Sequence, residues 1–200
     1  MIDCFAVRQF ADKIALEGPP PGGGSIAAVT GLMSVSLLEA LLRLSDKEEH
    51  YRRKTQLEDL RIALSALVER DGEALEELLE WDGGEVGREV VEQAAQVPLD
   101  TARLCLEVLE ICKQVWPNMR PHAIGDLAVV AFQAHAGLEG ALLGTVMNLP
   151  LMEEGNTKNA YQGQVMIIQE AAGQLACWIR ESLLSVTPFS MLSRALHNDA

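Results

Sequence analysis

Apolar residues recur along this chain at intervals of three and four residues, and no stretch alternates apolar and polar residues as a half-buried strand would. This spacing predicts an all-α fold, a bundle of about seven helices that forms one domain over residues 1–200. Pro98 is expected to kink or restart its helix because proline has no backbone N–H to donate. Seven helices are predicted. The first three cover 3–16, 25–44 and the charged segment SDKEEHYRRK through to 80. The others are a helix leading into 98, a helix from there to 115, a helix over 123–149, and a last helix that follows the polar loop EEGNTKN and reaches 185.

The glycine-rich stretch before the predicted central helix, GPPPGGGSIAAVTG at residues 18–31, is the most unusual local feature of the chain. Its prolines fix the backbone, its glycines remove side chains, and Ser25 is a good residue to cap the helix that follows. A bare loop before a helix N-terminus presents free N–H groups, which suit an anion or the polar head of a ligand. The alternative is a close-packed turn where another helix crosses.

The charge balance restricts the partners of the chain. A formal net charge of −13 argues against nucleic acid or an anionic membrane surface. One segment, SIAAVTGLMSVSLLEALLRL, is long enough to cross a membrane, but it carries Glu39 and Arg43 together with several serine, threonine and glycine residues. We therefore expect this segment to be the buried central helix of a soluble bundle, without a membrane partner.

The cysteines give an expectation of location. None of the four forms a CxxC pair, and the first residues, MIDCFAVRQF, do not make a signal peptide. Cys105 and Cys112 are one heptad apart, so they share a helix face and are expected in the core. A cytoplasmic location follows as the expectation.

Asp71 interrupts an otherwise apolar face of the third predicted helix. A carboxylate on a buried face is costly unless another group pairs with it. Asp71 is therefore expected to line a functional site, to hold an arginine, or to cap a neighbouring helix. The leucines that form this face are Leu57, Leu60, Leu64, Leu67, Leu75 and Leu78.

In the sixth predicted helix, a line of glycines leaves a groove into which a helix or a flat ligand could press. His122 and Asp126 lie at the loop end of this groove. The alternative is close helix packing, for which Ala27 and Gly31 provide small partners. His135 points to the opposite side of the helix from Asp126, so no metal site is expected there. The residues along the groove are Gln133, Gly137, Gly140, Gly144 and Asn148.

Several stretches together are similar to one enzyme family. In order they are PPPGGGSIAA, RLSDKEEHY, RDGEAL, AAQVPLDTARLCLEVLE, HAIGDLAVVA and ALLGTVMNL. The chain resembles the cyclodeaminase and methenyltetrahydrofolate cyclohydrolase family, which includes the cyclodeaminase half of formiminotransferase-cyclodeaminase. The resemblance implies an all-helical homodimer or larger assembly whose substrate is a tetrahydrofolate derivative, without a metal. It also implies one of two reactions: closure of formiminotetrahydrofolate with loss of ammonia, or hydrolysis of the methenyl bridge.

The resemblance further implies roles for individual residues. Asp71 would be the acid or base, because both reactions move protons beside a cationic one-carbon unit. Asp126 together with His122 would orient or stabilise that cationic carbon. The residues expected to bind the substrate, through backbone donors, hydrogen bonds or positive charge, are Gly22, Gly23, Gly24, Ser25, Arg43, Lys47, Tyr51 and Arg120.

The chain also departs from the family pattern. The family's Asn-Pro-Asn is replaced by Arg120, Pro121 and His122, and Val146 stands where an arginine is usual. These changes leave a second hypothesis, a catalytically inactive member that acts as a folate-binding or assembly module. The heptads of the third predicted helix suggest a third, a coiled-coil-like interaction protein, although this leaves PPPGGGS unexplained. The sequence does not choose between ammonia release and water addition.

Overall fold

The fold was obtained as a computed structural model, which describes residues 4–16, 21–82 and 87–183. All regular structure in these ranges is helical, so the predicted all-α bundle is confirmed. Pro19, Pro20, the centre of WDGGEVG and the tail from Thr187 lie outside the described residues. The main helices are α1 (Cys4–Leu16), α2 (Gly23–Ser45), α3 (Lys47–Glu80), α4 (Arg88–Val115), α5 (Ile124–Asn148) and α6 (Asn156–Trp178), the last continuing into a π-helical turn, Ile179–Leu183.

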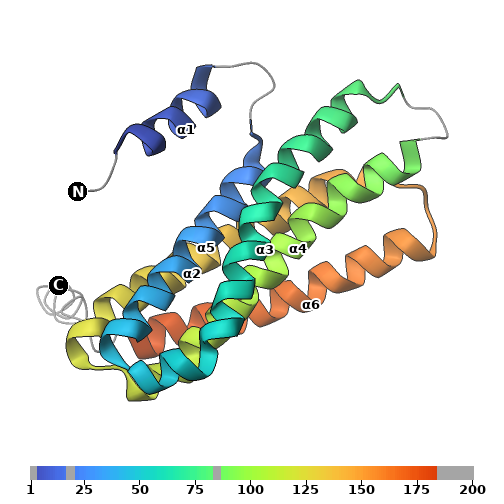
Figure 1. Ribbon diagram of the computed structural model, residues 1–200. Helices are drawn as coiled ribbons and strands as arrows, with labels where there is room; N and C mark the ends of the chain where they lie inside the picture. Colours follow the sequence, from blue (N-terminus) through green and yellow to red (C-terminus); the bar gives the residue numbers. More distant parts are fainter. Residues whose placement is uncertain (1–3, 17–20, 83–86, 184–200) are drawn as a thin grey trace, which may run out of the picture.

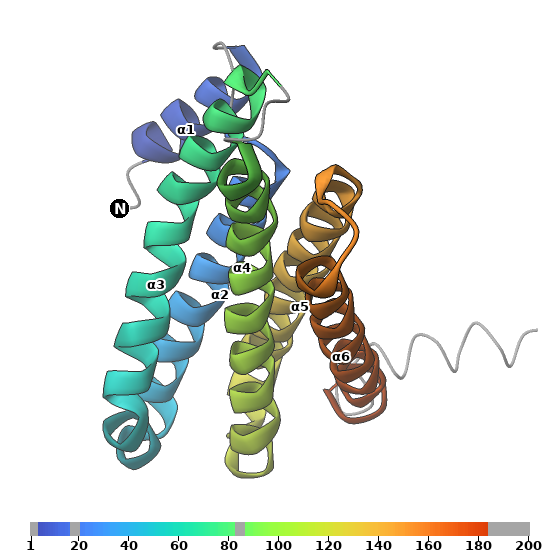
Figure 2. The ribbon, with the colours of Figure 1, turned by 90° about the vertical axis from the view of Figure 1, so that its right-hand side faces the viewer.

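The helices form two layers, with α2 and α5 side by side behind α3, α4 and α6 (Figure 2). Helix α2 packs against α3 on one side and α5 on the other, and both run antiparallel to it (Figure 1). Between α2 and α3 the chain turns at Asp46, whose side chain accepts a hydrogen bond from the Glu49 N–H at 3.0 Å and so caps α3. Helix α1 lies apart from the bundle, near the end where α2 begins (Figure 1).

The centre of the bundle is a contact between three helices at Cys105 of α4. A Cβ added to Gly31 of α2 would lie 2.6 Å from the Cys105 sulfur, and one added to Gly137 of α5 would lie 2.9 Å from the Ala27 carbonyl oxygen. Burial raises the pKa of the Cys105 thiol to about 12. Cys105 and Cys112 are both buried, as predicted, and small residues let the three backbones approach closely.

The predicted restart of the helix at Pro98 is wrong, because α4 is assigned as one helix through this residue. Proline at this position leaves the carbonyl of Ala94 without its helical donor. The Asn148 side chain of α5 supplies that donor at 2.7 Å, and Gly144 leaves room for the proline ring. The fourth and fifth predicted helices are therefore one, and six α-helices are present in the described residues.

Two segments, α2 and Pro121–Leu151, are long and apolar enough to cross a membrane by length and composition alone. Half of the most apolar window of each is buried inside the bundle. The remaining residues are partly buried or exposed, so each of these helices has one apolar side in the core and one apolar side at the surface.

Replacing Asn148 with alanine should lower the free energy of unfolding by about 1–3 kcal/mol, because it leaves the Ala94 carbonyl without a donor. In a chain that also carries Pro98→Ala, the restored backbone N–H at position 98 should reduce that cost to less than about 1 kcal/mol. Urea unfolding of the four chains of this cycle measures both values. Asn159→Ala, at an exposed position on α6, is the control, and equal losses in both backgrounds would contradict this account of Pro98.

Candidate functional site

The candidate site begins where α2 starts. Ser25 was predicted to cap this helix after a glycine loop, and that prediction is wrong: Gly22 is the N-cap, and Gly23 and Gly24 already belong to the first turn. The Ser25 hydroxyl instead donates to Asp71 Oδ2 at 2.7 Å, with the Val68 carbonyl at 3.3 Å. The carboxylate of Asp71 therefore comes from α3 to the positive end of α2, where the helix dipole favours a negative charge.

The Asp71 carboxylate occupies the space that a side chain at Gly24 would need. A Cβ at Gly24 would lie 1.9 Å from Asp71 Oδ1, which no real structure tolerates, whereas a Cβ at Gly23 would meet nothing within 4 Å. A Cβ at Gly22 would lie 3.1 Å from Leu75. Gly22 and Gly24 therefore pack closely against α3, as the alternative interpretation of this stretch, a close-packed turn crossed by another helix, predicts. The same packing leaves Asp71 only half-buried, with one carboxylate oxygen fixed by Ser25.

The other predicted site residues lie at the opposite end of the bundle. Gly137 of α5 lies against Ala27 and Gly31 of α2, so Asp126, three turns earlier on an antiparallel helix, is level with about residue 40 of α2. A rise of about 1.5 Å per residue then puts Asp126 about 25 Å from Gly24 along the bundle. This second group, all of it exposed, consists of Arg43, Lys47, Tyr51, Arg120, His122 and Asp126. One chain does not bring the two groups together.

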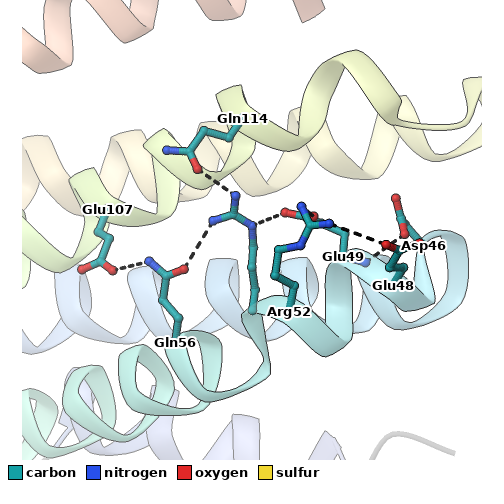
Figure 3. A network of polar contacts seen from close by, with 8 residues as sticks. Asp46, Glu48, Glu49, Arg52, Gln56, Glu107 and Gln114 are labelled. Atoms are coloured by element: carbon teal, nitrogen blue, oxygen red, sulfur yellow. Dashed lines mark hydrogen bonds and ion pairs between the residues drawn. The ribbon is translucent and has the colours of Figure 1, made fainter.

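Much of the positive charge at this second end is paired within the protein. Arg52 contacts Glu49 at 3.0 Å, and Arg53 is bonded to Glu49 and donates to Gln114 of α4 at 2.8 Å (Figure 3). Gln56 extends the network to Glu107 at 2.7 Å (Figure 3). Within the cluster HYRRK, Arg53 therefore links α3 to α4, whereas Arg52 pairs with an acidic residue of its own helix. Arg43, Lys47 and Arg120 remain as the exposed cations of the second group.

The glycine groove of α5 is filled by other helices. Gly137 and Gly140 face Ala27 of α2, and Gly144 faces Pro98 of α4, so the packing alternative is correct for all three. Within the described ranges, no three His, Cys, Asp or Glu side chains are grouped to hold a metal ion. The Gln133 side-chain oxygen is buried without a hydrogen-bond partner in the described structure.

A hollow of about 730 Å³, which the sequence did not indicate, lies at the same end of the bundle as Asp71. It is bordered by the start of α4 and the connection between α5 and α6, and an ion pair of 2.6 Å between Arg88 and Glu153 crosses its wall. Neither Asp71 nor the glycines of α2 line it, so it is separate from the predicted site. The spacing of residues along the sequence could not reveal this hollow, because its walls come from segments far apart in the chain, the start of α4 and the connection between α5 and α6.

Comparison with known proteins agrees with this architecture. A family model described as formiminotransferase-cyclodeaminase matches residues 6–166. A methenyltetrahydrofolate cyclohydrolase of Methylorubrum extorquens is 28% identical over 162 residues, which cover 71% of this chain and 78% of that protein. The crystal structure of a formiminotetrahydrofolate cyclodeaminase from Thermotoga maritima superposes with a TM-score of 0.84 at 19% identity, covering 93% of this chain and 99% of that one, and so shares the fold.

Gly24→Ala should destabilise the protein by about 1–3 kcal/mol, because the new methyl group displaces the Asp71 carboxylate from the first turn of α2. Gly23→Ala is the matched control and should change stability by less than about 1 kcal/mol, since its Cβ meets open space. Urea unfolding followed by circular dichroism measures both. An equal effect of the two substitutions would contradict the assignment of the crowded glycine.

Proposed function

Because this chain belongs to the formiminotransferase-cyclodeaminase family, we propose that it is an enzyme that opens or closes the one-carbon bridge of a tetrahydrofolate. Hydrolysis of methenyltetrahydrofolate is the first activity we assign, since the relative with 28% identity bears the name of that enzyme. The observation that carries the residue assignment is the carboxylate of Asp71, fixed by Ser25 through one oxygen at the start of α2.

The proposed chemistry needs a base next to a cation. Water adds to the positively charged methenyl carbon, the bond from that carbon to one folate nitrogen breaks, and a formyl group remains on the other nitrogen. One proton of the water passes to the released nitrogen and the other leaves to solvent. The free oxygen of Asp71 accepts the proton from the attacking water, and its negative charge stabilises the cation before attack.

Closure of formiminotetrahydrofolate uses the same groups in a related way. One folate nitrogen attacks the carbon of the protonated formimino group, the proton of the attacking nitrogen moves to the departing nitrogen, and ammonia leaves to give the methenyl cation. Asp71 moves the proton, while Asp126 and His122 of a second copy of the chain orient the carbon unit, because within one chain they lie too far from Asp71. Arg43, Lys47 and Arg120 attract the carboxylates of the folate, and Tyr51 provides an exposed aromatic surface for it. We extend the proposal to a homodimer located in the cytoplasm.

A catalytically inactive folate-binding or assembly module is the second candidate. The observation that favours it is the distance of about 25 Å between Asp71 and Asp126 within one chain, too far for two groups acting on one carbon. This candidate binds folate, or assembles with a partner, without turnover.

Asp71→Asn should reduce the rate of methenyltetrahydrofolate hydrolysis by about 100-fold or more, since the amide accepts no proton. The fold should persist, because the new amide oxygen still accepts the Ser25 hydroxyl. The decay of substrate absorbance, corrected for buffer, measures the rate. Asp59→Asn, at an exposed position on the same helix, is the matched control and should leave the rate unchanged.

Hydrolysis by the Asp71→Asn chain at the unmodified rate would refute the role of Asp71. If the unmodified chain acts no faster than buffer, ammonia release from formiminotetrahydrofolate tests the second reaction. Thermal stabilisation by folate without either reaction would favour the inactive module.

A further inference from the structure

The hollow of about 730 Å³ at the start of α4 takes no part in the proposed function. Its volume is within the roughly 300–1,000 Å³ of pockets that enclose small molecules. It lies at the end of the bundle where α3 ends and α4 and α6 begin (Figure 1). A Cβ at Gly87, the N-cap of α4, would collide with the Trp81 indole, so this ring lies directly against the start of α4 and forms one wall of the hollow.

Two polar contacts join α4 to the chain segment that leads into and forms α6. Arg88 pairs with Glu153 at 2.6 Å, just before α6 begins. About two turns further along α4, the Tyr161 hydroxyl of α6 donates to the Gln96 side-chain oxygen at 2.7 Å. Both contacts join residues that are 65 positions apart in the sequence. The two segments therefore run in the same direction and keep a constant register along the hollow.

Glu92 lies midway between these two contacts. It is four residues from Arg88 and four from Gln96, and so lies on the same side of α4. The interval of 65 residues puts Thr157 of α6 level with Glu92, and both of them line the hollow. Glu92 is half-buried, and no hydrogen bond or ion pair joins it to another residue within the part of the chain that the structure describes. Its carboxylate is thus the member of this series without a partner.

The charged residues around the hollow leave an excess of negative charge. One cation, Arg88, and three carboxylates, Glu92, Glu153 and Glu154, line it, which gives a formal sum of −2. Arg88 pairs with Glu153, and the buried Lys158 pairs with Glu154 at 2.6 Å. The unbalanced charge is therefore that of Glu92. A half-buried carboxylate is costly unless a cation or hydrogen-bond donor meets it.

The negative charge of Glu92 also acts on the neighbouring helix. Burial raises the pKa of the Tyr161 hydroxyl, and the charges of Glu92 and Asp100 raise it further, whereas Arg103 lowers it. Asp100 is paired with Arg103 on its own helix. Glu92 therefore directs its charge toward α6, across the hollow.

The remaining wall of the hollow is apolar. It consists of Trp81 at the end of α3, Val91 on α4, and Leu151 and Met152 before α6. An aromatic face beside a carboxylate suits a cation, because the ring attracts positive charge as the carboxylate does. It also accepts the hydrocarbon part of a ligand, which a hydrated metal ion lacks. Within the described ranges, moreover, no three His, Cys, Asp or Glu side chains are grouped to hold a metal ion.

We propose that this hollow binds a small organic cation, a primary amine with an aromatic or aliphatic body, whose ammonium group pairs with Glu92 beside the Thr157 hydroxyl. The ammonium has three N–H donors, which the carboxylate and the hydroxyl accept. The body of the amine lies against Trp81, Leu151 and Met152. A folate carries carboxylates, which the charge of this hollow repels, so the proposed ligand is a different molecule at a site separate from Asp71.

The experiment uses three probes of nearly equal size and different charge. Phenethylamine, 2-phenylethanol and 3-phenylpropionate are titrated into the full chain by isothermal titration calorimetry near pH 7. The amine should bind at least about tenfold more tightly than the alcohol, because only the amine forms a charged hydrogen bond with Glu92, and the carboxylate should bind least. Equal affinity for amine and alcohol, or no amine binding at about 10 mM, would overturn the inference.

Substitutions place the ammonium group. Glu92→Gln keeps the shape of the side chain and should weaken binding of phenethylamine by at least about tenfold, with little change for the alcohol. Glu89→Gln, at an exposed position in the first turn of α4, is the matched control and should bind the amine as the unmodified chain does. Amine binding that survives Glu92→Gln unchanged would overturn the inference.

A second substitution tests the aromatic wall and serves if Glu92→Gln does not fold. Trp81→Leu should weaken phenethylamine binding by about threefold or more, because it removes the ring that attracts the cation. Unchanged affinity in this variant would likewise contradict the proposed site. The titrations contain no folate, so their result holds whether or not the chain acts on a tetrahydrofolate.

Discussion

The close approach of three helices to the backbone of α2 is the constraint on which the rest of the structure depends. Cys105 of α4 lies against Gly31, the backbone at Ala27 lies against Gly137 of α5, and the Asp71 carboxylate of α3 lies against Gly24. At each point a single added methyl group would collide with a neighbour. The lack of a side chain at Gly24 and Gly31 of α2, and at Gly137 opposite Ala27, therefore sets how the neighbouring helices pack. At Gly24 it also brings a carboxylate to the N-terminus of α2.

Much of the fold could be predicted because most of its information is local. The leucine spacing of α3 and the heptad of Cys105 and Cys112 identified buried faces. The structure confirms them for both cysteines and for the leucines up to Leu67, whereas Leu75 and Leu78 are only partly buried. The break at Pro98 was wrong for a reason that is not local. The missing hydrogen bond is replaced by Asn148, which lies far away in sequence and belongs to the very stripe that was examined as a ligand groove. Side-chain periodicity gives the face on which Asn148 lies, but not the group it meets.

The candidate site shows the same division between local and distant information. Helix geometry singled out Asp71 and Asp126 as candidate site carboxylates. In the structure Asp71 is half-buried and bonded to Ser25, and Asp126 is exposed in the first turn of α5. Their relation depends on helix direction, however, and direction comes from how α2, α3 and α5 are connected in space. Because α3 and α5 both run antiparallel to α2, the end of α3 with Asp71 and the start of α5 with Asp126 lie at opposite ends. Periodicity gives the face of each helix on which these carboxylates lie but not the distance between them, and within one chain the fold keeps them apart.

Helix α2 is apolar on its buried side and also on its surface side, and this limits what can surround the surface side. Length and composition would allow α2 to cross a membrane. Its buried half packs against α3, however, whose own outer surface carries ion pairs such as Arg52 with Glu49 and Lys54 with Glu58. Lipid around α2 would also surround α3 and would have to accommodate those charges, at a cost of several kcal/mol each. The surface side of α2 and the outer side of α3 therefore favour different surroundings, apolar for the first and aqueous for the second.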